Sequence, residues 1–301
     1  MEDIERIKER LENIQSVEPI ITSLRTIAAG GWRTALRHQE SATSFADNLA
    51  EVLAVLLPHV SEEALARARI SRDNRPPRRA LMLVMASERG LCGAFNDTVL
   101  EGAERLIAQQ QLQSDEVLVA TLGKRAETHF LRQGRDLYMS YPLPITRVPS
   151  LGLVRELGEA LVDSLMAGEF DAIFAVYSPY KAATTAEPIS QRWLPIDASM
   201  LPSRYEGWTE PIIETEVGVL FERALEEWTF ARLYQFVIES ASSEQSARFR
   251  AMDAASSNLS RIIEELTLTY HTARQHAITM EMLDLVAGSG ILRGPASRRG
   301  H

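Results

Sequence analysis

The sequence is poor in cysteine and lacks long hydrophobic runs, and both features exclude classes of protein. Its single cysteine, Cys92, cannot form a disulfide within the chain, so a reducing, cytosolic compartment is expected rather than a disulfide-stabilised secreted fold. The best apolar window, Leu49 to Val60, is interrupted by Glu51, Pro58 and His59. It falls short of the roughly 18 apolar residues that a membrane-spanning helix needs. We expect no transmembrane segment, which leaves open a peripheral place in a membrane-attached assembly.

Positive charge is also scarce. The chain has 32 lysines and arginines against 41 acidic residues, which gives a net charge of −9. Such an excess of negative charge disfavours binding to nucleic acid. The sequence contains no glycine-rich phosphate-binding motif, no zinc-ligand pattern and no hydrolase nucleophile elbow. Cys92 has no partner base evident in the sequence, so a buried apolar role is favoured over a nucleophilic one. We expect no cofactor, no metal and no nucleic acid partner.

The first sixty residues show the hydrophobic periodicity of a helix. Apolar residues recur at spacings of three and four, which is typical of a helix that packs along another helix. This N-terminal seam consists of Ile4, Ile7, Leu11, Ile14, Val17, Ile21, Leu24 and Ala28. Pro19 implies either a kink or a fresh helix start, and Gly30 and Gly31 weaken the helix. We expect residues 1–60 to form one half of a coiled coil.

A second helical stripe lies near the other end of the chain and predicts a helix over 206–288. This C-terminal seam consists of Met252, Ala255, Leu259, Ile262, Leu266, Thr269, Ala273, His276, Met280, Leu283 and Ala287. Gly288 is positioned as a C-cap, so residues 289–301 are expected to be a flexible tail. The economical arrangement is a long antiparallel coiled coil of the two terminal helices, since both attach to one middle domain.

In the middle of the chain, the spacing of apolar residues changes from that of a helix to short continuous runs. Residues 61–79 hold six arginines, three acids and a double proline, which is typical of a linker. Short apolar runs follow at 80–86, 116–122 and 171–177, separated by helical stretches around 97–111, 124–133 and 153–167. That alternation predicts a central α/β, Rossmann-like domain over residues 80–205 with a partly parallel sheet.

Arginines on the first helix form a basic patch. Arg25, Arg33 and Arg37 lie in a stretch without any acidic residue between Ile20 and Gln39. A solvated helix face and a contact with a partner protein explain such a patch equally well, since arginine is favoured at charged interfaces.

Two motifs resemble those of the gamma subunit of F-type ATP synthases. Residues 87–96 read Ser-Glu-Arg-Gly-Leu-Cys-Gly-Ala-Phe-Asn, similar to the signature that follows the first strand in that family. The second motif spans 243–288 and includes the runs Leu-Thr-Leu-Thr-Tyr at 266–270 and Ala-Arg-Gln-His-Ala-Ile-Thr-Met-Glu at 273–281. The resemblance extends over essentially the whole chain.

This resemblance implies a central rotor stalk that has no active site of its own. The helix pair would sit inside a ring of alpha and beta subunits, and the globular domain would meet epsilon and the membrane c-ring at the cytoplasmic face of the cell membrane. Residues expected to contact the beta subunit are Arg274, Gln275, Thr279, Arg25 and Arg33. Gly90 and Gly93 are expected to relieve backbone strain in a turn between strand and helix.

The chain also departs from the family pattern. Arg25 stands where the family usually has a methionine, and His271 stands where it favours asparagine. Both changes fall in the coupling region, so a divergent or paralogous ATPase is possible. Two other hypotheses remain open: a standalone coiled-coil adaptor that kept the fold without the ring, and an α/β enzyme that uses Cys92 or Glu88.

Overall fold

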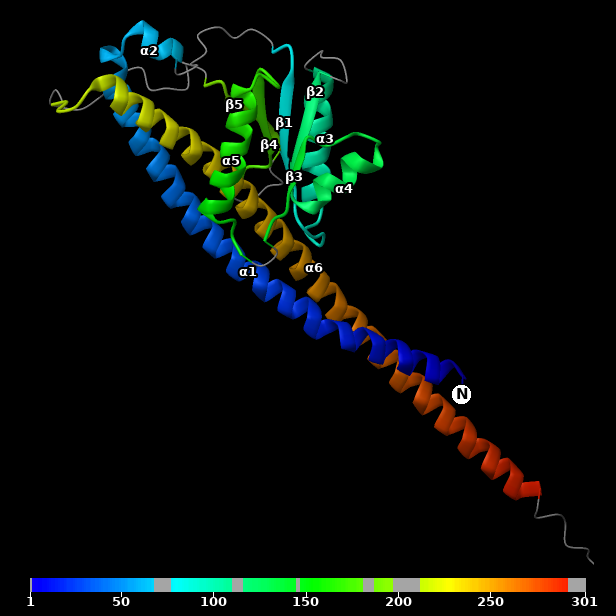
Figure 1. Cartoon of the computed structure of the whole chain (residues 1–301). Coiled ribbons are helices and arrows are strands. Elements are labelled where there is room, and N and C mark those ends of the chain that lie inside the picture. Colours follow the sequence, from blue (N-terminus) through cyan, green and yellow to red (C-terminus); the bar gives the residue numbers. More distant parts are fainter. Residues whose placement is uncertain are drawn as a thin grey trace, which may run out of the picture. The chain divides into compact units, whose positions relative to one another are not determined.

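Two long helices frame a central α/β domain in the computed structural model, which describes residues 2–67, 77–109, 116–144, 147–180, 187–196 and 212–291 (Figure 1). The helices are α1 (Glu2–Leu56) and α6 (Val217–Ile291). The chain divides into a larger unit, Thr26–Ala251, and a smaller unit of Met1–Arg25 with Met252–His301. The expected fold class is confirmed.

A five-stranded sheet with the order β3-β2-β1-β4-β5 forms the centre of the larger unit. The strands are β1 (Ala80–Met85), β2 (Val117–Leu122), β3 (Met139–Tyr141), β4 (Ala172–Tyr177) and β5 (Ile189–Leu194). All neighbouring pairs are parallel except β4 and β5, which are antiparallel. The three predicted apolar runs correspond to β1, β2 and β4, whereas β3 and β5 escaped prediction.

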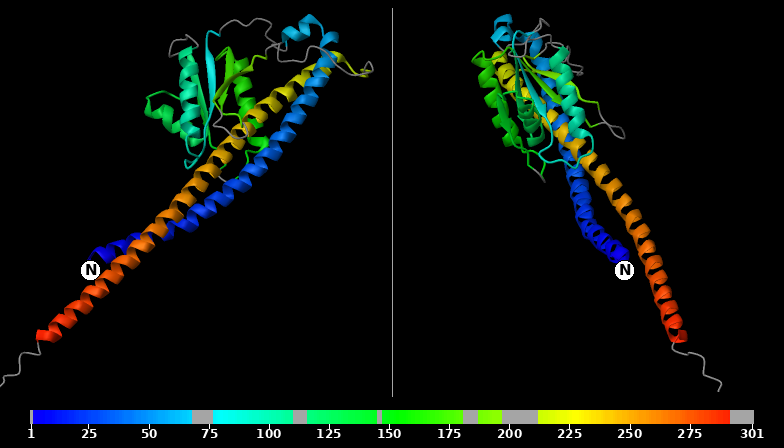
Figure 2. Two further views of the ribbon diagram at one scale, coloured as in Figure 1. Left: turned by 180° about the vertical axis from the view of Figure 1, so that it is seen from behind. Right: turned by 90° about the vertical axis from the view of Figure 1, so that its right-hand side faces the viewer.

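Helices cover both faces of this sheet (Figures 1 and 2). Side chains Ala80, Met82 and Val84 of β1 pack with α3 (Phe95–Gln109) and α4 (Lys124–Arg132). The alternate β1 side chains join α5 (Leu151–Met166), α6 and the end of α1 in the other core. Because β1 is buried on both faces, its sequence is continuously apolar. A short 3-10 turn (Leu57–His59) and α2 (Glu62–Arg67) follow α1.

Within the larger unit, α1 and α6 run antiparallel. The Tyr234 hydroxyl lies 3.2 Å from His38 Nδ1, and Gln235 Nε2 donates to Thr43 Oγ1 at 3.3 Å. Earlier along α1, a Cβ placed on Gly31 would lie 3.0 Å from the side chain of Gln245. Residue numbers on α6 therefore fall as those on α1 rise, as the sequence predicts.

The smaller unit contains the ends of both seams. The N-terminal seam faces inward from Ile4 to Leu24, except that Val17 is 40% exposed. On α6 the predicted seam residues up to Leu266 and Ala273 are half-buried or buried, but Tyr270 and Ala277 are half-buried in place of Thr269 and His276, which are exposed. An α-helix drifts by about 20° per heptad relative to a strict seven-residue repeat, so a continued spacing of three and four gradually leaves the inward face.

Three local expectations need correction. A fresh helix start at Pro19 is wrong, because α1 continues through this residue from Glu2 to Leu56. The prediction of Gly288 as a C-cap is also wrong, because α6 extends to Ile291. The range 61–79 contains the short helix α2, while 68–76, 197–211 and 292–301 lie outside the described residues. Within the described part of the chain, no helix is long and apolar enough to cross a membrane.

Gly158 on α5 gives a direct test of this packing. A Cβ there would lie 2.8 Å from Phe230 and 3.1 Å from Leu233 of α6, so Gly158→Ala overpacks the contact between the helices. We expect a loss of about 1–3 kcal/mol in the free energy of unfolding, measured by urea denaturation. The control is Gly152→Ala on the same helix, where the nearest atom is 4.0 Å away. Equal stability of both variants would contradict the described packing.

Candidate functional site

The loop between β1 and α3 carries the first motif and is held by its own polar groups. Asn96 Oδ1 accepts a hydrogen bond from the Ser87 backbone N–H at 3.0 Å, and the Ser87 hydroxyl donates to the Arg89 carbonyl at 2.7 Å. Ser87 is fully buried, so these bonds satisfy groups that water cannot reach. The polar residues of the motif therefore shape a tight turn.

The two glycines of this loop differ in their surroundings. Gly93 has a φ of +57°, in the left-handed region that glycine adopts easily. Gly90 has no positive φ; the other left-handed residue of the loop is Leu91, with a φ of +64°. A Cβ on Gly90 would instead lie 2.4 Å from Arg125 Nη2. Gly90 thus allows the close approach of a side chain, rather than the strained backbone that was expected there.

Cys92 and Glu88 are both engaged within the fold. Cys92 is 1% exposed, and Asn96 Nδ2 donates to its sulfur at 3.1 Å. Burial raises the pKa of the Cys92 thiol, which keeps it in the less nucleophilic protonated form. Glu88 Oε2 accepts backbone N–H groups of Lys124 and Leu143 at 3.1 and 2.9 Å. The burial predicted for Cys92 is confirmed, although its sulfur accepts a hydrogen bond from Asn96. Glu88 ties the loop to α4 and to the chain after β3.

Arg25, expected to contact a partner, lies in an ion pair within the chain. Its guanidinium Nη1 is 3.0 Å from Asp253 Oδ1 on α6, and both residues belong to the smaller unit. The side chains are 39% and 51% exposed, so the pair is worth at most about 1 kcal/mol. Sequence reasoning missed Asp253, although it directly follows seam residue Met252, just as Arg25 follows Leu24.

The other expected contact residues lie on exposed helix surfaces. Arg274, Gln275 and Thr279 are exposed on α6 in the smaller unit, and the Thr279 hydroxyl donates to the Gln275 carbonyl at 2.9 Å. Arg33 is exposed on α1 in the larger unit. Neither Arg274 nor Arg33 pairs with an acidic side chain within the described ranges. Their charges are therefore available to another molecule.

The described residues also offer few groups for small-molecule chemistry. Across the part of the chain that the structure describes, no three His, Cys, Asp or Glu side chains gather where they could hold a metal ion. The arrangement instead presents helix surfaces, a tight loop and a sheet that is covered on both faces.

Comparison with known proteins identifies the family. A family model described as ATP synthase matches residues 3–292. The ATP synthase gamma chain of Geobacter sp. (strain M21) is 30% identical over 98% of this chain and 100% of its own length. That of Paracoccus denitrificans is 28% identical over 97% and 100%. The chain belongs to the ATP synthase gamma-chain family. Gamma chains are non-catalytic, so an active site on Cys92 or Glu88 is excluded.

Solved structures agree with the gamma-chain fold. A chain of the Euglena gracilis mitochondrial ATP synthase, from a structure of OSCP, F1 and c-ring, is 14% identical with a TM-score of 0.66 and covers 99% of both chains. A chain of the Tetrahymena thermophila mitochondrial ATP synthase central stalk and c-ring is 20% identical with a TM-score of 0.58, covering 79% of this chain and 99% of that one. This gamma chain is accordingly a peripheral, central-stalk subunit of a rotary ATP synthase.

The burial of Cys92 predicts slow chemical modification. In the native gamma chain at pH 8, iodoacetamide should alkylate Cys92 at least about tenfold more slowly than in urea, because the thiol is both inaccessible and less ionised. Mass spectrometry of timed samples measures both rates. An equal rate in the two states would show that Cys92 is accessible, contrary to the structure.

The Arg25–Asp253 pair predicts a small, specific coupling energy. In a double-mutant cycle with Arg25→Met and Asp253→Asn, thermal unfolding of the full chain should give a coupling of about 0.2–1 kcal/mol. High salt should reduce this coupling, since both side chains are partly exposed. Strictly additive effects at low salt would mean that the two residues do not pair.

Proposed function

We propose that this chain transmits rotation between the membrane sector and the catalytic beta subunits. In this proposal the C-terminal part of α6 is the surface that contacts the ring of alpha and beta subunits. Ion flow turns the stalk during synthesis, and ATP hydrolysis turns it in reverse. The observation that carries this proposal is the family match over residues 3–292, which includes both long helices and the α/β domain. A chain that had kept only an adaptor role would not need all of these parts.

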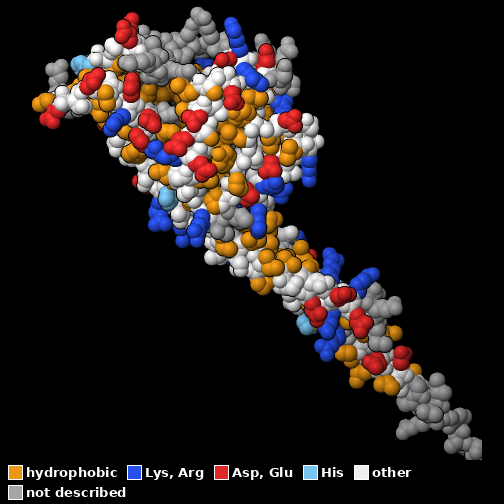
Figure 3. Space-filling view, in the orientation of Figure 1, with side chains coloured by type: hydrophobic (Ala, Val, Ile, Leu, Met, Phe, Trp, Pro, Cys, Tyr) orange, Lys and Arg blue, Asp and Glu red, His pale blue; other side chains and the backbone are white. Residues whose placement is uncertain are grey.

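The exposed end of α6 supports a partner that surrounds it. Large hydrophobic side chains there are about half to two-thirds exposed, namely Ile278, Met280, Met282, Leu283, Leu285 and Val286. Figure 3 shows hydrophobic side chains gathered at this end of the helix. Contiguous exposed apolar surface marks a protein interface. We infer that the ring of alpha and beta subunits covers this end.

Polar residues at the start of that exposed stretch supply a candidate contact with the beta subunit. Arg274, Gln275 and Thr279 are exposed within two helical turns, and the guanidinium has no acidic partner within the described ranges. A charged donor that meets a backbone carbonyl or carboxylate of the beta subunit would gain a charge-assisted hydrogen bond. Arg33 is a second candidate, whereas the Asp253 ion pair makes Arg25 less available.

The α/β domain is the part that we assign to epsilon and the c-ring, at the cytoplasmic face of the cell membrane. Two solved relatives come from assemblies that contain a c-ring, which supports this assignment. The sequence-based division into 1–60, 61–79, 80–205, 206–288 and 289–301 stays a prediction within this proposal.

The experiment is co-expression of this chain with alpha and beta subunits from the same organism. We expect a complex of three alpha, three beta and one gamma subunit whose ATPase activity depends on this chain. If the chain elutes alone and leaves alpha and beta unaffected, the proposal fails and the adaptor hypothesis replaces it.

The candidate beta contacts can be tested in the same complex. We expect Arg274→Ala together with Gln275→Ala to lower the gamma-dependent ATPase rate by about tenfold, since a hydrogen bond to a charged group contributes about 1.5–3 kcal/mol. The control is Arg261→Ala, which removes an exposed arginine that pairs with Glu265 of its own helix. Equal rates for both variants would remove Arg274 and Gln275 from the proposed contact.

A further inference from the structure

The helix α6 carries a largely buried ion pair, Glu244 with Arg248, one helical turn apart. Arg248 Nη1 lies 2.7 Å from Glu244 Oε1, and the two side chains are only 11% and 12% exposed. Burial raises the pKa of Glu244, and the nearby guanidinium offsets part of that effect. Charges at this depth are tolerated only when paired and hydrogen-bonded. The pair thus holds the Arg248 side chain in a defined place.

From this place Arg248 reaches out of the helix to the loop after β1. Its Nη2 donates to the carbonyl oxygen of Arg89 at 3.0 Å and to that of Gly90 at 3.4 Å. A guanidinium has five N–H donors in a fixed fork, so one side chain can bind Glu244 and both carbonyls together. Arg248 therefore joins α6 to the loop by directional bonds.

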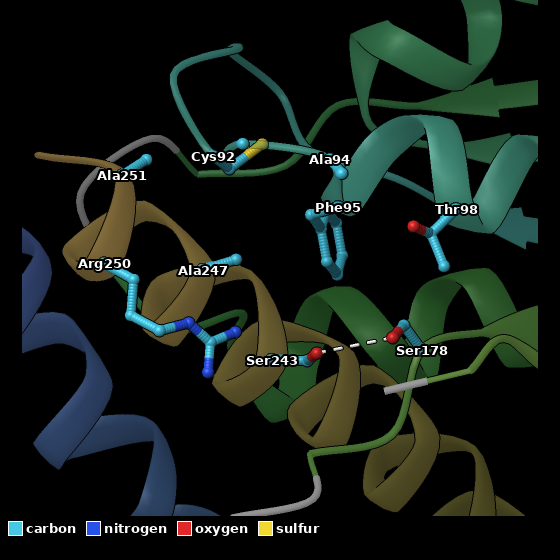
Figure 4. A pocket seen from close by; sticks show the side chains of 10 residues that line it. Cys92, Ala94, Phe95, Thr98, Ser178, Ser243, Ala247, Arg250 and Ala251 are labelled. Carbon is cyan, nitrogen blue, oxygen red and sulfur yellow. Dashed lines mark hydrogen bonds between the residues drawn. The ribbon is translucent and has the colours of Figure 1, made fainter. Parts of the chain in front are cut away.

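Beside these hydrogen bonds, the apolar contacts of α6 with the loop and α3 involve small side chains such as Ala247. A cavity of about 450 Å³ lies between α6 and the start of α3, lined by Cys92, Phe95, Ser178, Ser243 and Ala247 among others (Figure 4). A Cβ on Gly93 would lie 3.9 Å from the Ala251 Cβ, so at that point the two segments meet through small groups. Dispersion contacts between small groups are individually weak and apolar burial is non-directional, whereas hydrogen bonds to a guanidinium fix direction.

The loop itself is tied firmly to the α/β domain. Glu88 binds backbone N–H groups of Lys124 and Leu143, and Ser87 is bound by Asn96. Forces on the loop are thus passed to α3, α4 and the sheet. The larger compact unit ends at Ala251, three residues after Arg248. Arg248 is the last residue of α6 before this boundary with a described hydrogen bond to the α/β domain.

We propose that Arg248 is a positioning residue that makes α6 and the α/β domain turn as one body up to this boundary. The inference rests on the proposed function as a rotating stalk. Without the bonds to Arg89 and Gly90, the last turns of α6 in the larger unit are free to twist against the domain. Part of the torque then deforms the stalk instead of driving ion transport.

The test uses the whole ATP synthase in inverted membrane vesicles. Because Arg248→Ala alone leaves Glu244 buried without a partner and risks misfolding, the main variant combines Glu244→Gln with Arg248→Met. These uncharged side chains of similar size keep the packing and remove both the ion pair and the loop bonds. The matched control is Arg250→Ala, an exposed arginine two residues further along α6 that lines the same cavity without a described hydrogen bond to the loop.

Two quantities are measured in each enzyme: hydrogen exchange of the backbone amides at 88–93, and ions pumped per ATP hydrolysed, with H⁺ and Na⁺ uptake both followed. For the main variant we expect exchange about tenfold faster, the factor for losing one charge-assisted hydrogen bond, together with fewer ions per ATP. Arg250→Ala should change neither. Faster exchange with unchanged pumping would reduce Arg248 to a merely structural role and overturn the inference, as would no change in either quantity.

ATP hydrolysis and pumping by wild-type vesicles distinguish a failure of this inference from a failure of the proposed function. If wild-type vesicles hydrolyse ATP without pumping, or lack this chain, the rotating-stalk function fails and the inference falls with it. If wild-type vesicles pump normally and the main variant does too, only the role of Arg248 is refuted.

Discussion

The burial of one face of α6 is the interaction on which the larger unit depends. Phe221, Trp228, Leu233 and Phe236 on this helix share a core with α5, the sheet and the end of α1. Because the same helix continues to Ile291, the element that completes the core also extends beyond it. A sheet that is covered on both faces cannot move independently of that helix without exposing apolar surface. The α/β domain and the long helix are therefore joined by side chains of both that lie in one apolar core.

Polar contacts add direction to this attachment where the core ends. Apolar burial is non-directional, so it resists separation more than sliding. The larger unit supplements it with hydrogen bonds between elements: Tyr177 donates to Glu239 at 3.0 Å, and Arg248 donates to the loop after β1. In the smaller unit the helices carry one cross-helix ion pair among the described contacts, Arg25 with Asp253. The described hydrogen bonds between α6 and the α/β domain thus oppose sliding where the core ends.

Much of this architecture could be predicted from the sequence, because long helices and buried parallel strands have strong periodic signals. The strands β3 and β5 could not. The first has only three residues, and the second reads Ile-Ser-Gln-Arg-Trp-Leu, in which pairing with β4 overrides a polar composition. Arg274, Gln275 and Thr279 could be proposed as contact residues only through the family motif, since exposed side chains have no periodic signal, whereas Arg25 and Arg33 also stood out as part of a basic patch. The partners of Arg25 and Arg248 depend on tertiary contacts between distant segments, which local pattern cannot supply.

Observation of rotation in single molecules tests the central claim most directly. Because Cys92 is buried, Arg105→Cys on the exposed side of α3 would provide one reactive site for a bead on the α/β domain. The alpha and beta subunits are fixed to a surface and ATP is added. The account predicts that the bead turns continuously in one direction while ATP is hydrolysed. A bead that stays still while the same complexes hydrolyse ATP would contradict it.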